Sequence, residues 1–204
     1  MIYVMIGGPA TGKGTRSQIL ADSLNIPHIS TGDILREESR NNLDMKAKLS
    51  RGELISDDVI TNLLYKRLSQ KDCDNGFVLD GYPRTLNQAK LLDELLNKLN
   101  KKITLVVELL ASDELVFRRI LERQSCPKCG KMYGLDFPPK VKGICDVCGA
   151  KLVTRSDDTK ETLQKRIDVY KKNAEPIIEY YKNEGLLRSL DSSGHPERIV
   201  NEVK

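Results

Sequence analysis

The sequence has no tryptophan, only three phenylalanines and only two histidines. Because aromatic residues make up 5 % of the chain, the hydrophobic core has to be built from leucine, isoleucine and valine. No stretch approaches the ~20 consecutive apolar residues of a membrane-spanning helix. The first apolar run, residues 2–6, is too short for a signal peptide and has no basic leader. The two histidines have no partner pattern, so we assign neither any chemistry.

The chain also lacks internal repeats, low-complexity segments and a strong excess of one charge. Its net charge is +4 and its pI is about 8.7, which suits anionic ligands but falls short of a nucleic-acid-binding stripe. Four of the five cysteines form two tight pairs, which indicates metal ligation in a reducing compartment rather than disulfides. We therefore expect a cytoplasmic protein without nucleic-acid or membrane partners, long enough for one sizeable core plus inserts.

Apolar runs alternate with helical patterns along most of the chain. Strands are predicted at residues 2–6, 27–29, 77–79, 103–110 and 186–190, with amphipathic helices between them. Strands that alternate with helices predict an α/β fold, a parallel sheet covered by helices on both faces. Two stretches break the alternation and are interpreted as inserts: residues 30–55 are polar and weakly periodic, and residues 125–156 are rich in cysteine, glycine and proline.

The most informative motif is Gly7-x-x-x-x-Gly12-Lys13, directly after the first apolar run. Glycines let backbone N–H groups curl around an anion, and the helix that follows points its positive end at the same place. Lys13 adds a mobile charge for β- and γ-phosphates. The next residue is Gly14 rather than serine or threonine, and Thr15 follows one place later. A strand, loop, lysine and helix in this order predict a nucleotide-binding phosphate loop.

Two further segments follow predicted strands. Residues 30–33, Ser-Thr-Gly-Asp, are typical of a helix cap, and the alternative is that Thr31 and Arg36 contact a second nucleotide. Residues 80–84 begin with Asp80 at the end of a buried strand, where a carboxylate can hold Mg²⁺ through water. Arg84 offers a planar fork for phosphate, although the segment can also be a turn with a solvated arginine. Gln88 fits a capping box with residue 85, a base contact, or both.

The second half of the chain supplies more cations. Arg119 and Arg123 lie four residues apart on one face of a predicted helix. Taken alone, this spacing is most simply interpreted as a solvent-exposed face of the helix. Beyond the cysteine-rich insert, Arg155 and Arg166 flank an acidic pair at residues 157 and 158. Asp158 also fits a helix cap, because glutamate follows three residues later.

The cysteines follow the pattern C-x₂-C-x₁₅-C-x₂-C, and a glycine follows the second cysteine of each pair. Four thiolates at this spacing suit a closed, structural tetrahedral Zn²⁺ site, and iron can use the same ligands. Cys73 is left over and is interpreted as an inert thiol. The ligands of the predicted metal site are Cys126, Cys129, Cys145 and Cys148.

Taken together, these segments resemble adenylate kinase in its long form with a zinc-bearing lid, and the likeness covers nearly the whole chain. The phosphate loop, residues 30–33, residues 80–88, the arginines and the four cysteines stand in that family's order and spacing. The resemblance implies a five-stranded parallel sheet with helices on both faces, a P-loop NTPase-like core, plus two mobile inserts. The implied core comprises residues 1–29, 56–121 and 158–204, the AMP-binding insert residues 30–55, and the lid residues 122–157.

The resemblance also implies the reaction MgATP + AMP ⇌ 2 ADP and a role for each matching residue. The implied catalytic residues are Lys13, Arg84, Arg123, Arg155 and Arg166. The implied ATP-binding residues are Gly8, Pro9, Ala10, Thr11, Gly12, Lys13, Gly14, Thr15, Arg119 and Arg123, with Arg119 stacked on the adenine. The implied AMP-binding residues are Thr31, Arg36, Gly81, Arg84, Gln88, Arg155 and Arg166. Asp33 and Asp80 would hold Mg²⁺ through water, the four cysteines structural Zn²⁺, and a monomer fits one cleft closing on itself.

The chain departs from the family pattern at three places. Ala10 stands where the family usually has glycine, which implies strain of roughly 1–2 kcal/mol if that position needs positive φ. The insert around residues 37–50 is a few residues short. Gln124 replaces an arginine that many members carry beside Arg123.

Two other functions compete with this interpretation. A pyrimidine nucleoside monophosphate kinase usually has alanine where Thr31 stands, so Thr31 with Gln88 favours adenine. The second is a nucleic-acid-binding protein that is switched by nucleotide and binds nucleic acid through the cysteine-rich insert. That insert has several lysines, but Tyr133 and Phe137 are its only aromatic residues on which bases could stack.

Overall fold

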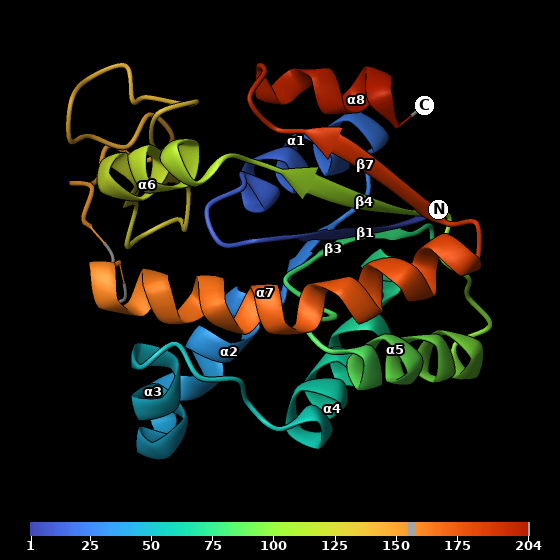
Figure 1. The fold of residues 1–204 in the computed structure, drawn as a ribbon. Helices are drawn as coiled ribbons and strands as arrows, with labels where there is room; N and C mark the ends of the chain where they lie inside the picture. Colours follow the sequence, from blue (N-terminus) through green and yellow to red (C-terminus); the bar gives the residue numbers. More distant parts are fainter. Residues whose placement is uncertain (155–157, 204) are drawn as a thin grey trace.

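The computed structural model describes residues 1–154 and 158–203 (Figure 1). Its main sheet has five parallel strands in the order β2-β3-β1-β4-β7, which confirms the predicted fold class. β1 lies at the centre because the first apolar run is buried along its whole length. The strands are β1 (Ile2–Gly7), β2 (His28–Ser30), β3 (Phe77–Asp80), β4 (Leu105–Leu110) and β7 (Leu187–Asp191).

Helices cover both faces of this sheet (Figure 1). α1 (Lys13–Leu24) and α8 (Ile199–Glu202) lie on one face, and α4 (Asp57–Leu68), α5 (Leu86–Lys98) and α7 (Lys160–Asn183) lie on the other. α6 (Asp113–Glu122) follows β4 and leads toward the cysteine-rich insert. Pro196 opens a 3-10 turn (Pro196–Arg198) that continues into α8.

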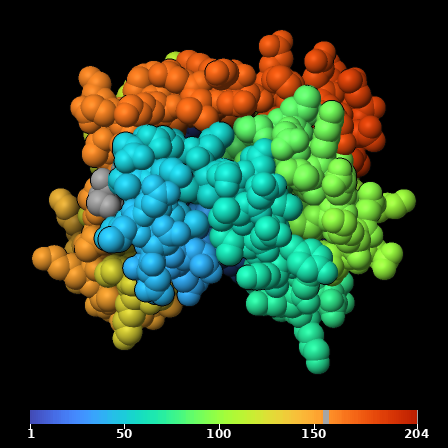
Figure 2. All heavy atoms as spheres, turned by 90° about the horizontal axis from the view of Figure 1, so that it is seen from below, coloured from blue at the N-terminus to red at the C-terminus, as the bar shows by residue number. Residues whose placement is uncertain are grey.

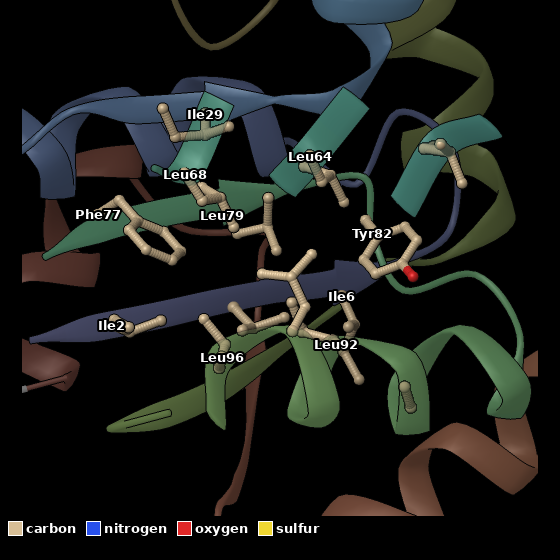
Figure 3. Packing of buried hydrophobic residues seen from close by; sticks show 14 of the residues in the cluster. Ile2, Ile6, Ile29, Leu64, Leu68, Phe77, Leu79, Tyr82, Leu92 and Leu96 are labelled. Atoms are coloured by element: carbon tan, nitrogen blue, oxygen red, sulfur yellow. The ribbon is translucent and has the colours of Figure 1, made fainter. Parts of the chain in front are cut away.

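The alternation of side chains along β1 explains the two-sided core. Ile2, Val4 and Ile6 join a cluster beneath α4 and α5, while Tyr3 and Met5 join a second cluster beneath α1 and α8. Figure 3 shows Ile2 and Ile6 among the leucines of α5 and the apolar residues of β3. Each fully buried side chain of this kind contributes about 1.5–3 kcal/mol relative to exposure. The two clusters therefore fix β1, and with it the loop that follows its carboxyl end.

The first insert contains more regular structure than its weak periodicity predicts. α2 (Thr31–Glu38) starts at an N-cap, Ser30, whose side chain accepts from the Asp33 N–H, and α3 (Leu43–Ser50) follows a short 3-10 turn. Met45 of α3 is buried in the main core. These helices have eight residues each, too few for an apolar period to stand out. In Figure 2 the insert lies beside α4 and against the start of α7.

The second insert forms a small lobe around β5 (Gln124–Ser125) and β6 (Met132–Tyr133), which pair antiparallel. Its own buried cluster consists of Cys126, Tyr133, Cys145 and Leu152. So small a cluster buries little apolar surface, so the lobe gains little hydrophobic stabilisation of its own. Among the described residues, the search for a helix long and apolar enough to cross a membrane finds none.

Ala10 lies in the phosphate loop at φ 56°, the left-handed conformation that glycine prefers. Its strain of about 1–2 kcal/mol leads us to expect that Ala10→Val lowers the free energy of unfolding by about 2 kcal/mol, because β-branched residues tolerate this region least. Ala10→Gly should equal or exceed the wild type, since strain relief offsets the higher entropy of the unfolded chain. Urea unfolding measures both changes.

Ala111 provides the matched control, because it packs against the same apolar cluster as Ala10 and is not among the positive-φ residues. Ala111→Val should therefore show only the packing part of the effect. Equal losses for Ala10→Val and Ala111→Val would show that backbone strain at Ala10 is not significant.

Candidate active site

The carboxyl ends of β1 and β3 open into a cavity of about 970 Å³. Ligands of open parallel sheets bind at this edge, and the volume lies at the upper end of the range for small-molecule sites, about 300–1,000 Å³. The phosphate loop, the first insert and the cysteine-rich lobe all contribute to its walls. The cavity therefore joins the three parts of the chain that carry the predicted motifs.

The phosphate loop begins at Gly7, and α1 starts at Lys13, as the motif predicts. Gly12 has φ 87°, and a Cβ there would lie 2.3 Å from Nη1 of Arg16, so only glycine fits. The Lys13 ammonium folds back over the loop and donates to the carbonyl oxygens of Gly7 at 2.8 Å and Gly8 at 2.6 Å. Desolvation lowers the pKa of Lys13 to about 8, although Asp80 opposes this shift. An incoming phosphate can replace the two carbonyls as partner of the ammonium.

The structure places most, but not all, of the predicted ATP-binding loop in the cavity wall. Gly8 and Thr11 do not line it. Thr11 is buried, and its hydroxyl donates to the Gly8 carbonyl at 2.9 Å, which holds the loop in shape. The loop residues that line the cavity are Pro9, Ala10, Gly12, Lys13, Gly14 and Thr15.

Asp80 ends β3 at the cavity and is 9 % exposed. A Cβ on Gly14 would lie 3.4 Å from Asp80 Oδ2, so the carboxylate faces the start of α1. Asp33 also lines the cavity and forms an ion pair with Arg36. Carboxylate oxygens beside a phosphate loop are ligands that fit a hydrated Mg²⁺.

His28 was assigned no chemistry from the sequence, yet the structure places it beside this carboxylate. Its Nε2 lies 3.7 Å from Asp80 Oδ2 and has no hydrogen-bond partner. Its Nδ1 lies 3.3 Å from Gln18 Oε1. A lone histidine on a short strand carries no sequence signal, because its neighbour comes from β3, about fifty residues further along the chain.

Several arginines converge on the same cavity. Arg84 lines it and donates from Nε to the Gly81 carbonyl at 2.8 Å. Desolvation lowers the pKa of Arg84, and nearby Arg166 and Arg36 lower it further. A cation whose pKa is lowered by neighbouring cations lies in a site that is complementary to anions.

Asp158 links the two ends of the cysteine-rich insert. Its side chain is fully buried and forms ion pairs with Arg123, at the end of α6, and with Arg166 Nη1 at 3.9 Å, on α7. The capping interpretation of Asp158 is wrong, because Thr159 accepts from the Thr162 N–H and caps α7 instead. Arg155 and the aspartate at 157 lie outside the described residues, so the structure does not place them.

Arg119 is only 6 % exposed, so its interpretation as part of a solvated face is wrong. Its guanidinium donates to the Thr11 carbonyl at 3.2 Å and to Ser192 Oγ at 3.0 Å. It also forms an ion pair at 2.7 Å with Asp136 of the cysteine-rich lobe. Arg119 and Asp136 both line the cavity. Asp136 was missed because an isolated aspartate inside an irregular insert has no pattern, and the stacking role of Arg119 stays a prediction.

Of the residues predicted to contact AMP, Thr31 alone among those described does not line the cavity. It is 1 % exposed, and its hydroxyl donates to the Asp80 carbonyl at 3.1 Å. Gln88 lines the cavity. It also has part of the predicted capping role, because its backbone N–H donates to Oγ1 of the N-cap residue Thr85 at 3.1 Å. The predicted AMP-binding residues in the wall are Arg36, Gly81, Arg84, Gln88 and Arg166.

The four paired cysteines meet in the lobe, and their sulfur atoms all lie within 4.8 Å of one another. Tetrahedral Zn²⁺ with Zn–S bonds of about 2.3 Å needs sulfurs roughly 3.8 Å apart, so the cluster fits such an ion. Tyr133 lies with its hydroxyl 3.4 Å from Cys145 Sγ, and this hydrogen bond lowers the pKa of Cys145 to about 6. The four side chains therefore form a candidate metal site, as the spacing predicts.

Comparisons with known proteins agree with this geometry. The adenylate kinase family profile matches residues 5–186. An adenylate kinase of Methanocella arvoryzae is 44 % identical over 210 residues, covering 100 % of this chain and 97 % of that protein. Those of Thermosipho melanesiensis and Clostridium kluyveri are 44 % and 41 % identical and also span the whole chain, covering 97 % and 96 % of their own lengths. Because the family profile covers most of the chain and these relatives match it over its whole length, the chain belongs to the adenylate kinase family.

Proposed function

We propose that this protein catalyses reversible phosphoryl transfer from MgATP to AMP, giving two ADP. The observation that carries the proposal is the convergence of Lys13, Arg84, Arg123 and Arg166 with Asp80 on one cavity at the carboxyl edge of the sheet. Membership of the adenylate kinase family supports the same reaction. The nucleotides ATP, AMP and ADP are the partners, and the enzyme acts as a cytoplasmic monomer.

The reaction needs no nucleophile from the protein. Phosphoryl transfer passes through a loose transition state whose charge spreads over the equatorial oxygens, so placement and charge neutralisation do most of the work. Lys13 and the arginines surround the transferred group, and Arg155 joins them by the family resemblance. Arg36 and Arg84 hold the AMP phosphate. Asp33 and Asp80 would hold Mg²⁺ through water, and the bound ion would neutralise charge on the ATP phosphates.

The two inserts exclude water from this chemistry. Residues 30–55 close over AMP and residues 122–157 close over ATP, while the remaining segments form the core. The contacts of Asp136 with Arg119 and of Asp158 with Arg123 support this division, because they join the lid to the core beside the cavity. Closure expels water and strengthens every charge interaction inside the cavity.

The metal of the lid is zinc, and its role is structural. Four thiolates leave no open coordination position, so the ion cannot bind substrate or activate water. The lid has only a small apolar cluster of its own, and metal binding replaces the cohesion that a larger core would give. Tyr133 supports the site through the hydrogen bond between its hydroxyl and Cys145.

A coupled assay with ATP and a panel of nucleoside monophosphates tests the proposed function. We expect AMP to be the best acceptor and ADP to be the product. Faster turnover with UMP or CMP than with AMP would assign the protein to the pyrimidine kinases instead. Absence of any diphosphate product in the presence of magnesium would contradict the proposal as a whole.

A further inference from the structure

Asp57, the first residue of α4, contacts two amide side chains of α5. Its Oδ1 accepts from Gln88 Nε2 at 2.7 Å, and its Oδ2 accepts from Asn87 Nδ2 at 2.6 Å. On the other side of the Gln88 amide, Oε1 accepts from the backbone N–H of Arg84 at 2.7 Å. Gln88 is 1 % exposed and lines the cavity.

These contacts determine which way the Gln88 amide points. A carboxylate such as Asp57 can only accept hydrogen bonds, so it must face the NH₂ group, and a backbone N–H can only donate, so it must face the oxygen. Rotating the amide by half a turn would place two donors together on the Arg84 side and two acceptors together on the Asp57 side. Both pairs would then be unsatisfied at a buried site, which is strongly unfavourable.

The locked Gln88 amide keeps one N–H and one oxygen lone pair unused, because each amide group has two donors and two acceptor positions. Adenine offers a complementary edge, with N1 as acceptor beside the N6 amino donor. A 6-oxopurine such as hypoxanthine offers the reverse, with N1–H as donor beside the O6 acceptor. A base of the second kind needs the opposite amide orientation, which Asp57 prevents.

We propose that Asp57 is a positioning residue that sets the base selectivity of the acceptor site, favouring 6-aminopurines over 6-oxopurines through the orientation of Gln88. The inference rests on the proposed function, since it takes Gln88 as the residue that contacts the AMP base. Asp57 itself does not touch the nucleotide in this account.

Steady-state kinetics with AMP and IMP as acceptors test the proposal. For Asp57→Ala we expect the preference for AMP over IMP, measured as the ratio of kcat/KM values, to fall by about tenfold, because the unfavourable contact on the Asp57 side is removed and only the Arg84 N–H still opposes the reversed amide. The change should reside in KM for both acceptors, with kcat nearly constant. Asp57→Asn should restore the selectivity, because Asn keeps one oxygen for Gln88 and exposed Asn87 can turn its own amide.

Asp58→Ala is the matched control, because Asp58 is the other acidic residue of the first turn of α4 and is exposed. Asp58→Ala removes the same favourable charge at the helix N-terminus but does not affect the contacts of Gln88. The AMP-to-IMP ratio of kcat/KM values for this variant should therefore stay within about threefold of wild type. If Asp57→Ala does not fold, Asp57→Ser keeps a residue suited to the helix start while removing the obligate acceptor.

Two failures can be told apart. A wild-type protein that does not phosphorylate AMP would contradict the proposed function. A wild type that prefers AMP, together with an unchanged AMP-to-IMP ratio in folded Asp57→Ala and Asp57→Ser, would overturn the role of Asp57 alone.

Discussion

Replacement of Lys13 by methionine is expected to lower kcat/KM for ATP and AMP by about 10³-fold or more, equivalent to roughly 4 kcal/mol of transition-state stabilisation. Methionine preserves most of the side-chain volume but removes the positive charge of the ammonium, which the proposed mechanism places beside the transferred phosphoryl group. In the free protein the ammonium contacts two loop carbonyls, so it is already placed within the loop before ATP binds. A coupled ADP-release assay at saturating magnesium measures the loss.

Two variants separate charge from geometry at this position. Lys13→Arg keeps a full charge but places it further from Cα, so it should recover only part of the activity. Lys66→Met removes an exposed lysine of α4 and should leave kcat/KM near the wild-type value. Activity of Lys13→Met within tenfold of the wild type would contradict the role of the phosphate loop in transfer.

Removal of the lid metal is expected to lower the melting temperature by about 10 °C while turnover at low temperature stays close to normal. A metal held at 1,000 times its Kd contributes about 4 kcal/mol to the folded state. For a chain of this size each kcal/mol corresponds to about 2–4 °C. Loss of a structural ion should not change the turnover number, provided that the lid remains folded at the assay temperature. Calorimetry before and after chelation measures the shift.

The cysteine variants show whether the shift belongs to the four-cysteine cluster. Cys145→Ser should have a lowered melting temperature that no longer responds to the chelator. Cys73 is the control, because it is buried outside the cluster and its thiol contacts Arg67. Cys73→Ser should keep the full response to chelation, whatever its own stability. Loss of phosphoryl transfer from a metal-free protein that is still folded would contradict the structural role.

Local signals in the sequence were sufficient to predict the sheet and the cluster of four cysteines. Strand β1 is a run of apolar residues and β4 is apolar except for Glu108, as expected for buried strands, and the glycine spacing after β1 requires a tight loop. The cysteine spacing likewise defines a cluster without reference to the rest of the chain. Prediction failed where one short polar segment meets another far along the chain. Asp158 was interpreted as a cap of α7, whereas its side chain pairs with Arg123, which lies 35 residues earlier in the chain.

The candidate site likewise contains residues that the local sequence predicts and residues that only the fold brings together. Lys13 and Asp80 were found because each follows a buried strand, and the carboxyl ends of parallel strands meet at one edge. The contacts of His28, Asp57 and Asp136 were not predicted, because each of these residues meets a partner that another element brings to it. A single polar residue has no periodicity, so nothing in its own neighbourhood distinguishes it from a solvated one.

Residues close together in the chain are enough to specify three parts of this protein: a parallel sheet, a phosphate loop and a four-cysteine cluster. The partner that each charged or polar side chain meets depends instead on how the whole chain packs. This packing buries Arg119 against Ser192 and orients the Gln88 amide between Asp57 and Arg84. The physical reason is that a hydrogen bond or ion pair depends on distance in space, and packing of the sheet and helices sets those distances.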